Sequence, residues 1–185
     1  MSVVVIEFIT LDGVVSDPDG SAGTPRGGWA FRYGPEAVAG DKFRLGRTLD
    51  DGVLLLGRGT WQLFSRLWPT RDDPFSMRMN AVPKMVASRT LTDTSAWSGS
   101  TVLDGDLVDA VKRERRDVVV TGSLSVVEQL RTADLVDEYR LITFPTVLGT
   151  GARLFPSDGP HAELECVLAE QVGAAVLSCY RRAGR

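Results

Sequence analysis

Basic and hydroxyl side chains follow three short apolar runs of the sequence, each at the point where the run ends. The three motifs are Gly57-Arg58-Gly59-Thr60, Ser88-Arg89-Thr90 and Gly122-Ser123. Guanidinium and hydroxyl groups donate hydrogen bonds to phosphate, and so do the free N–H groups at the start of a helix. Any one of these motifs alone is equally typical of a solvated turn. Together they predict a site for a phosphate-bearing ligand.

One ligand can contact all three motifs only if the strands formed by the preceding apolar runs place the motifs at the same edge of a sheet. Residues 53–56, 84–87 and 118–120 are continuous apolar runs apart from Lys84, which is typical of strands buried in a parallel sheet. In such sheets, ligands bind outside the carboxyl ends of the strands. Thr60 can cap the helix after the first run, and Ser123 stands where an N-cap belongs. If the strands are parallel, one extended ligand can reach all three motifs.

Two common nucleotide motifs are missing from the sequence. No Gly-x-Gly-x-x-Gly follows the first strand, and Gly57-x-Gly59 lacks the third glycine. A Gly-x-x-x-x-Gly-Lys-Ser/Thr loop is also absent, which argues against an ATPase or a kinase.

Short apolar runs alternate with helical patterns, which predicts an α/β fold with a mainly parallel, mixed sheet flanked by helices. We expect strands over 2–9, 53–56, 84–87, 101–103 and 118–121, and helices over 36–49, 60–67, 106–115 and 124–132. The last third alternates in the manner of strands over 138–143, 164–169 and 174–180, which predicts antiparallel C-terminal strands. The 185 residues suit a single domain over 1–185.

Charge and composition argue against several partners. The net charge is −3, and we read the one basic cluster, residues 112–116, as a solvated helix face, so we expect no nucleic acid partner. The apolar runs are too short to cross a bilayer, and no signal sequence is evident, so we expect no membrane association and a cytoplasmic location. Two cysteines and one histidine do not predict disulfides or a metal site.

A glycine-rich segment over 10–35 separates the first strand from the rest of the chain. Such a segment inside a compact domain is typical of a mobile functional loop. Its aromatic side chains Trp29, Phe31 and Tyr33 suit either stacking on a flat substrate or anchoring of the loop to the core.

The motifs, in this order, resemble the dihydrofolate reductase superfamily and most closely the RibD C-terminal domain (riboflavin-biosynthesis reductase) family. The resemblance rests on the motifs above together with residues 7–13, 80–84, 135–141 and 145–155. It implies the dihydrofolate-reductase-like fold. It also implies NADPH as cofactor, bound by residues Gly57, Arg58, Thr60, Ser88, Arg89, Thr90, Gly122 and Ser123. Ser88 and Arg89 would hold the 2′-phosphate, which favours NADPH over NADH.

The resemblance also bears on catalysis. Dihydrofolate reductases carry an acid on the helix before the Gly-Arg-x-Thr segment, and Asp41 stands at a similar separation from Arg58. Asp12, beside the glycine-rich loop, is the rival candidate, and a surface carboxylate is the structural alternative for Asp41. Dihydrofolate reductases have paired glycines where this chain has Gly122-Ser123, and we expect Ser123 to cap the helix there.

The expected function is an NADPH-dependent reductase that transfers hydride to a small, heterocyclic substrate. The alternatives are a non-catalytic NADP(H)-binding protein and a stand-alone 5-amino-6-(5-phosphoribosylamino)uracil reductase of riboflavin biosynthesis. The resemblance of residues 145–155 and the late strands to subunit-pairing elements predicts a homodimer, with a monomer as the alternative.

Overall fold

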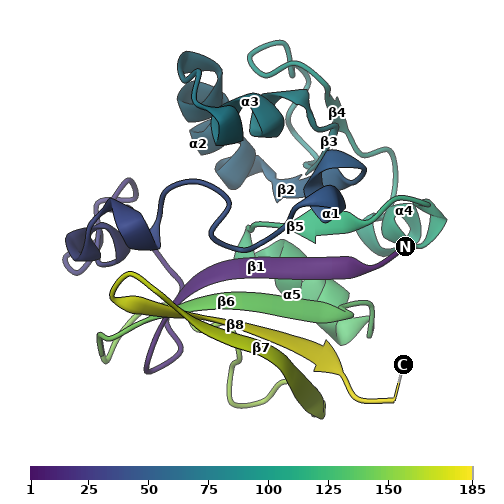
Figure 1. Ribbon diagram of the computed structural model, residues 1–185. Helices are drawn as coiled ribbons and strands as arrows, with labels where there is room; N and C mark the ends of the chain where they lie inside the picture. Colours follow the sequence, from purple (N-terminus) through teal and green to yellow (C-terminus); the bar gives the residue numbers. More distant parts are fainter. Residues whose placement is uncertain (185) are drawn as a thin grey trace. The chain divides into compact units, whose positions relative to one another are not determined.

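The computed structural model describes residues 1–184, and its centre is one mixed sheet of eight strands flanked by helices (Figure 1). The strand order is β4-β3-β2-β5-β1-β6-β8-β7. The pairs β1/β5, β2/β5, β2/β3 and β3/β4 are parallel, whereas β6/β8 and β7/β8 are antiparallel. The expected fold class, a mainly parallel sheet with antiparallel C-terminal strands, is therefore confirmed.

The elements have the following bounds. The strands are β1 Val3–Thr10, β2 Val53–Gly57, β3 Lys84–Ala87, β4 Ser100–Val102, β5 Val118–Val120, β6 Glu138–Phe144, β7 Leu164–Val172 and β8 Ala175–Arg182. The α-helices are α1 Arg47–Asp50, α2 Arg58–Leu67, α3 Pro74–Ala81, α4 Leu107–Arg113 and α5 Leu124–Thr132. Three 3₁₀ turns lie at η1 Ala30–Tyr33, η2 Pro35–Ala37 and η3 Trp68–Thr70.

The chain divides into two compact units, which we describe separately. Unit 1 comprises residues 1–5 and 45–137, and unit 2 comprises residues 6–44 and 138–185. Strands β2 and β5 of unit 1 are buried along their whole length, as the continuous apolar runs predict. The core of unit 2 includes Ile142, Phe144 and Leu177 from its strands, and Trp29 from the glycine-rich segment.

The helix expected over 36–49 is wrong. The structure has the short turn η2, then irregular backbone, then the single turn α1. Gly40, Arg44 and Gly46 have φ values of 71°, 54° and 49°, and a right-handed helix cannot pass through residues in the left-handed region.

Helix α3 is not among the helices expected from sequence, because prolines such as Pro69 and Pro74 are typical of a connection between elements. The helix begins at Pro74, where the missing N–H of proline costs nothing. The carboxylate of Asp73 accepts hydrogen bonds from the backbone N–H groups of Phe75 and Ser76, each at 3.1 Å. Asp-Pro before an apolar residue was the available signal for this helix start.

Lys84 is the buried cation of unit 1 and is only 1% exposed. Its Nζ donates hydrogen bonds to the backbone oxygens of Asn80 at 2.6 Å and Ser98 at 3.0 Å. It also lies 4.4 Å from the centre of the Trp97 ring, within the range of a cation–π interaction. Lys84 therefore links the end of α3 to the segment before β4.

We expect Lys84→Met to lower the free energy of unfolding by about 2 kcal/mol, because two buried carbonyl groups lose their donor. Urea unfolding followed by circular dichroism measures the change. Lys112→Met on the exposed side of α4 is the matched control and should stay within about 0.5 kcal/mol of the parent. Equal effects of the two substitutions would contradict this role of Lys84.

Candidate functional site

The register of the parallel strands brings the three motifs of unit 1 to one edge. Gly57 at the end of β2 pairs with Ala87 at the end of β3, and Leu55 pairs with Val120 at the end of β5. The motifs begin at or just after these paired residues, so they follow the carboxyl ends of neighbouring strands. We call residues 57–60, 88–90 and 122–123 the phosphate edge.

Side chains from two of the motifs meet directly. Arg58 Nη1 donates to Thr90 Oγ1 at 2.7 Å, which joins the start of α2 to the turn after β3. Ser88 Oγ accepts from the backbone N–H groups of Thr90 at 3.2 Å and Leu91 at 2.9 Å, and it therefore shapes this turn while keeping its own proton to donate. Arg89 is exposed, and its guanidinium has no hydrogen bond or ion pair within residues 1–184. The adjacent residues Ser88 and Arg89 thus offer a hydroxyl donor and a guanidinium at the phosphate edge.

Helices α2 and α5 begin without a side-chain cap. Gly57 is the N-cap of α2, and Ser123 is the N-cap of α5, but neither helix start has a side-chain cap hydrogen bond. The carboxylates of Asp73 and Asp106, by contrast, cap α3 and α4. The first-turn N–H groups of α2 and α5 accordingly lack a side-chain acceptor, and such groups attract anions.

Two expectations about capping need correction. Thr60 lies inside the first turn of α2 and does not cap it, because the helix already begins at Arg58. Ser123 does occupy the N-cap position of α5, but its Oγ lies 2.9 Å from Ser125 Oγ and makes no capping hydrogen bond.

At Gly57, the backbone of β2 lies close to the backbone of the Gly122-Ser123 turn. Its N–H donates to the Gly122 oxygen at 3.0 Å. A Cβ at Gly57 would lie 2.3 Å from Ser123 Oγ and 3.1 Å from Ser123 N. Gly122 has a φ of 98°, which favours glycine, and the Gly122–Ser123 peptide bond is cis. Gly59 faces open space, since a Cβ there would meet nothing within 4 Å.

These contacts predict different results for the two glycines of the Gly57-Arg58-Gly59 motif. We expect Gly57→Ala to lower the free energy of unfolding by about 1–3 kcal/mol, because the added methyl group forces the Ser123 turn to shift. Gly59→Ala is the matched control, and we expect it to raise stability by up to about 1 kcal/mol, since alanine favours a helix over glycine. Thermal unfolding of the two variants checks this, and a destabilised Gly59→Ala with an unchanged Gly57→Ala would contradict it.

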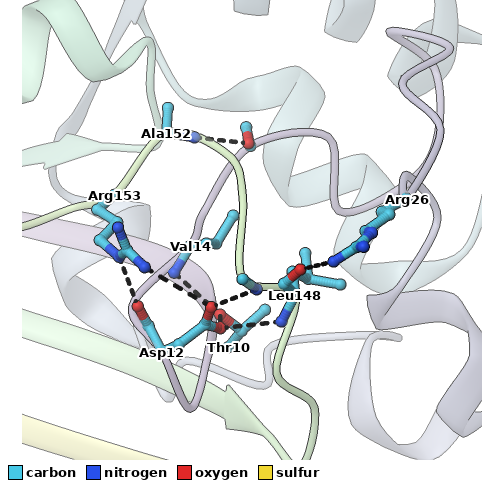
Figure 2. Close-up of polar contacts among 9 residues, drawn as sticks. Thr10, Asp12, Val14, Arg26, Leu148, Ala152 and Arg153 are labelled. Atoms are coloured by element: carbon cyan, nitrogen blue, oxygen red, sulfur yellow. Dashed lines mark hydrogen bonds and ion pairs between the residues drawn. The ribbon is translucent and has the colours of Figure 1, made fainter.

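In unit 2, the Asp12 carboxylate joins the turn after β1 to the segment after β6 (Figure 2). It accepts hydrogen bonds from Thr10 Oγ1 at 2.6 Å, Leu148 N at 3.2 Å and Gly149 N at 2.7 Å. Arg153 Nε donates to the backbone oxygen of Asp12 at 2.9 Å. The Thr10 hydroxyl, with the Gly149 N–H, lowers the pKa of Asp12 to about 2.

This environment suits a structural anion better than an acid catalyst. With a pKa of about 2, Asp12 has no proton to donate at neutral pH. Asp41, the other acid suggested by the resemblance, lies half-buried in the turns between η2 and α1, not on a helix. Its part in catalysis stays a prediction.

Sequence reasoning overlooked a third acid, Glu7 on β1. Burial raises the pKa of Glu7 to about 8, and its carboxyl group has no hydrogen bond within residues 1–184. Glu7 therefore keeps a proton at neutral pH, which is the state required of a proton donor. The signal was present, because an acid interrupts an otherwise apolar strand ending in threonine.

The glycine-rich segment of unit 2 is folded around Asp17. The Asp17 carboxylate accepts hydrogen bonds from Ala22 N at 2.9 Å and from Thr24 N at 2.8 Å. Arg26 Nη1 donates to the Leu148 oxygen, as Figure 2 shows. Trp29 is 1% exposed and donates from Nε1 to the Ser16 oxygen at 3.0 Å, so it anchors the segment to the core.

A membrane-spanning helix and a metal-binding cluster are both absent from the described part of the chain. Within residues 1–184, no helix is long and apolar enough to cross a membrane. The same residues contain no cluster of three or more histidine, cysteine or acidic side chains that is arranged to hold a metal ion.

The chain has the fold of dihydrofolate reductase. The chain has a TM-score of 0.58 and 15% identity to dihydrofolate reductase from Enterococcus faecalis complexed with NADP(H) and RAB-propyl, covering 98% of this chain and 96% of that one. A crystal structure of a Shewanella sp. PV-4 protein, described as a riboflavin biosynthesis protein, gives a TM-score of 0.74 at 21% identity, covering 98% and 99% of the two chains. At these identities the likeness concerns the fold.

Residues 1–178 match the RibD C-terminal domain family, and the chain belongs to that family. It is also 27% identical over 112 residues to the uncharacterized protein YyaP of Bacillus subtilis strain 168. That match covers 56% of this chain and 58% of YyaP, so it spans little more than half of that relative. The family is of the reductase type, as the resemblance of the motifs indicated.

Proposed function

We propose that the chain is an NADPH-dependent reductase that transfers hydride to a small, heterocyclic substrate. The observation that carries the proposal is the phosphate edge. There, the register of parallel strands brings together the uncapped starts of α2 and α5 and the hydrogen-bond donors of Ser88 and Arg89. Membership of the RibD C-terminal domain family and the fold shared with an NADP(H)-complexed dihydrofolate reductase support it.

The donor set of the phosphate edge fits NADPH. Arg89 offers an unpaired, planar guanidinium beside the Ser88 hydroxyl, which suits a ribose 2′-phosphate. The uncapped starts of α2 and α5 offer N–H groups for the diphosphate. The open space at Gly59 lets a ligand approach the backbone of α2 closely.

The roles of this chain's residues follow from these placements. When bound, NADPH supplies a hydride, and the protein's part is to bind, to orient and to exclude water. Arg58, Arg89 and Ser88 would bind the cofactor phosphates, and Gly122 would allow close approach at the diphosphate. Burial raises the pKa of Glu7 in unit 2 to about 8, so this carboxyl group holds its proton at neutral pH. Asp12 would hold the turn after β1 in place.

Oxidation of NADPH, followed at 340 nm, tests this function. The substrates to compare are dihydrofolate and the pyrimidinone ribose phosphate of riboflavin biosynthesis, with NADH in place of NADPH as the cofactor control. We expect turnover with NADPH and much less with NADH. NADPH binding by calorimetry with no turnover of any flat heterocycle would favour a non-catalytic NADP(H)-binding protein. No binding at all would overturn the proposal.

A further inference from the structure

Aspartate is followed by glycine at five places in the chain, and folding decides which of these pairs can rearrange its own backbone. The pairs are Asp12-Gly13, Asp19-Gly20, Asp51-Gly52, Asp104-Gly105 and Asp158-Gly159. In such a pair the backbone nitrogen of glycine can attack Cγ of the aspartate, because glycine has no Cβ to obstruct the approach. The attack requires a glycine N–H that is free of hydrogen bonds and a carboxyl group that can turn toward it.

Four of the five glycine N–H groups are held by hydrogen bonds in turns. Each donates to the backbone oxygen of the residue three positions earlier: Gly13 to Thr10 at 2.9 Å, Gly20 to Asp17 at 3.3 Å, Gly52 to Leu49 at 3.3 Å and Gly159 to Pro156 at 3.4 Å. The carboxylates of Asp12, Asp19 and Asp51 accept hydrogen bonds as well. In these pairs a hydrogen bond has to break before the nitrogen can attack, so the fold restrains them.

Asp104-Gly105, in unit 1, is the pair without such restraints. Both residues are exposed, and neither makes a hydrogen bond or an ion pair within residues 1–184. Gly105 has a φ of 82°, and a Cβ there would meet nothing within 4 Å. Neither a hydrogen bond nor a neighbouring element therefore opposes the approach of the Gly105 nitrogen to Asp104 Cγ.

The residues on both sides of this pair are fixed. Leu103 N, just after β4, donates to the Val86 oxygen at 2.9 Å. The Asp106 carboxylate caps α4 by accepting hydrogen bonds from two N–H groups of its first turn, at 2.8 Å and 3.1 Å. Asp104-Gly105 is thus a free link between two held points. Since the pair contributes no contact of its own, its rearrangement does not require β4 or α4 to unfold.

We propose that Asp104 isomerises spontaneously to isoaspartate in the folded protein. The Gly105 nitrogen bonds to Cγ of the protonated Asp104 carboxyl group, the proton of the nitrogen and the carboxyl OH leave as water, and a succinimide ring closes. Water then adds to the ring carbonyl that came from the Asp104 main chain, and the bond from that carbon to the nitrogen breaks. The main chain now runs through Cβ and Cγ, so the link between β4 and α4 is one atom longer. The mass is unchanged, and the reaction needs neither an oxidant nor a cofactor.

Incubation of the full chain at neutral pH for several weeks, folded and in denaturant, tests this proposal. Trypsin places Asp104 in the peptide 90–112 and Asp51 in the peptide 48–58, and an isoaspartate peptide keeps its mass but changes its chromatographic retention. We expect the rate at Asp104 to be the same within about twofold in both states, because unfolding releases no hydrogen bond of this pair. The rate at Asp51 should be about twofold to tenfold lower in the folded chain, because the Gly52 N–H is held there.

Two substitutions assign the signal to its residue. Asp104→Glu should abolish the isoaspartate in the peptide 90–112, because a glutamate would have to close a larger ring, and this exposed residue has no contact to lose. Asp51→Glu is the matched control and should leave that isoaspartate unchanged. Unfolding curves establish that both variants are folded. Isoaspartate at Asp104 that forms only in denaturant would overturn the proposal. So would a slowing by the fold equal to that at Asp51, or an undiminished signal in Asp104→Glu.

Discussion

Replacing Arg89 by alanine is expected to weaken NADPH binding by between about tenfold and 150-fold, because a hydrogen bond to a charged group contributes about 1.5–3 kcal/mol. NADH lacks the 2′-phosphate, so its Kd should change little. Arg89 is exposed and has no partner within residues 1–184, and its removal leaves the protein's own contacts intact. Isothermal titration with both cofactors at one fixed salt concentration measures the effect.

Arg113→Ala provides the control for this prediction. Arg113 is another exposed arginine of unit 1, but it lies on α4, whose start is capped by Asp106. We expect its removal to leave both affinities unchanged apart from a small general effect of charge, which salt screens. Equal losses for NADPH and NADH in Arg89→Ala, or equal losses in the two variants, would show that Arg89 does not select the 2′-phosphate.

The second large effect is expected from Glu7. Burial raises its folded-state pKa to about 8, from 4.5 in an ordinary environment. Between these two values the unfolded chain has released the proton and the folded chain has kept it, so stability falls as pH rises from about 4.5 to 8. Release of one proton on unfolding corresponds to a loss of at most about 1.4 kcal/mol for each pH unit inside this window.

Glu7→Gln should remove this slope, because glutamine does not titrate, and the variant should be the more stable protein at pH 8. Urea unfolding at several pH values from 5 to 8 measures the slope. Asp12 and Glu114, with pKa values of about 2, titrate below this window and do not disturb it. Glu163→Gln, on an exposed residue, is the control and should keep the parental slope. A parental slope in Glu7→Gln would refute the assignment.

The strand ends and helix starts that carry the three motifs could be predicted from sequence because each of them is local, whereas phosphate binding there stays a prediction. A continuous apolar run followed by Gly-Arg or Gly-Ser signals a buried strand and a helix start, as found for β2 with α2 and for β5 with α5. The pairing of these strands is not local. The structure supplies this pairing, in which Gly57 of β2 is the partner of Ala87 in the parallel strand β3.

The features that sequence reasoning did not find depend on distant contacts or on single backbone positions. Asp12 and Leu148 lie 136 residues apart, so no spacing rule could show that Asp12 anchors the segment after β6. The helix expected over 36–49 has apolar residues at helical spacing, but the φ values at Gly40 and Gly46 prevent it. The sequence shows that Glu7 interrupts an apolar strand, but periodicity alone does not show that its carboxyl group is buried.

A crystal structure of the chain with NADPH bound tests the central claim most directly. The account predicts the 2′-phosphate within hydrogen-bond distance of Ser88 and Arg89, and the diphosphate over the starts of α2 and α5. Cofactor density elsewhere on the chain, or a 2′-phosphate that contacts neither Ser88 nor Arg89, would contradict it.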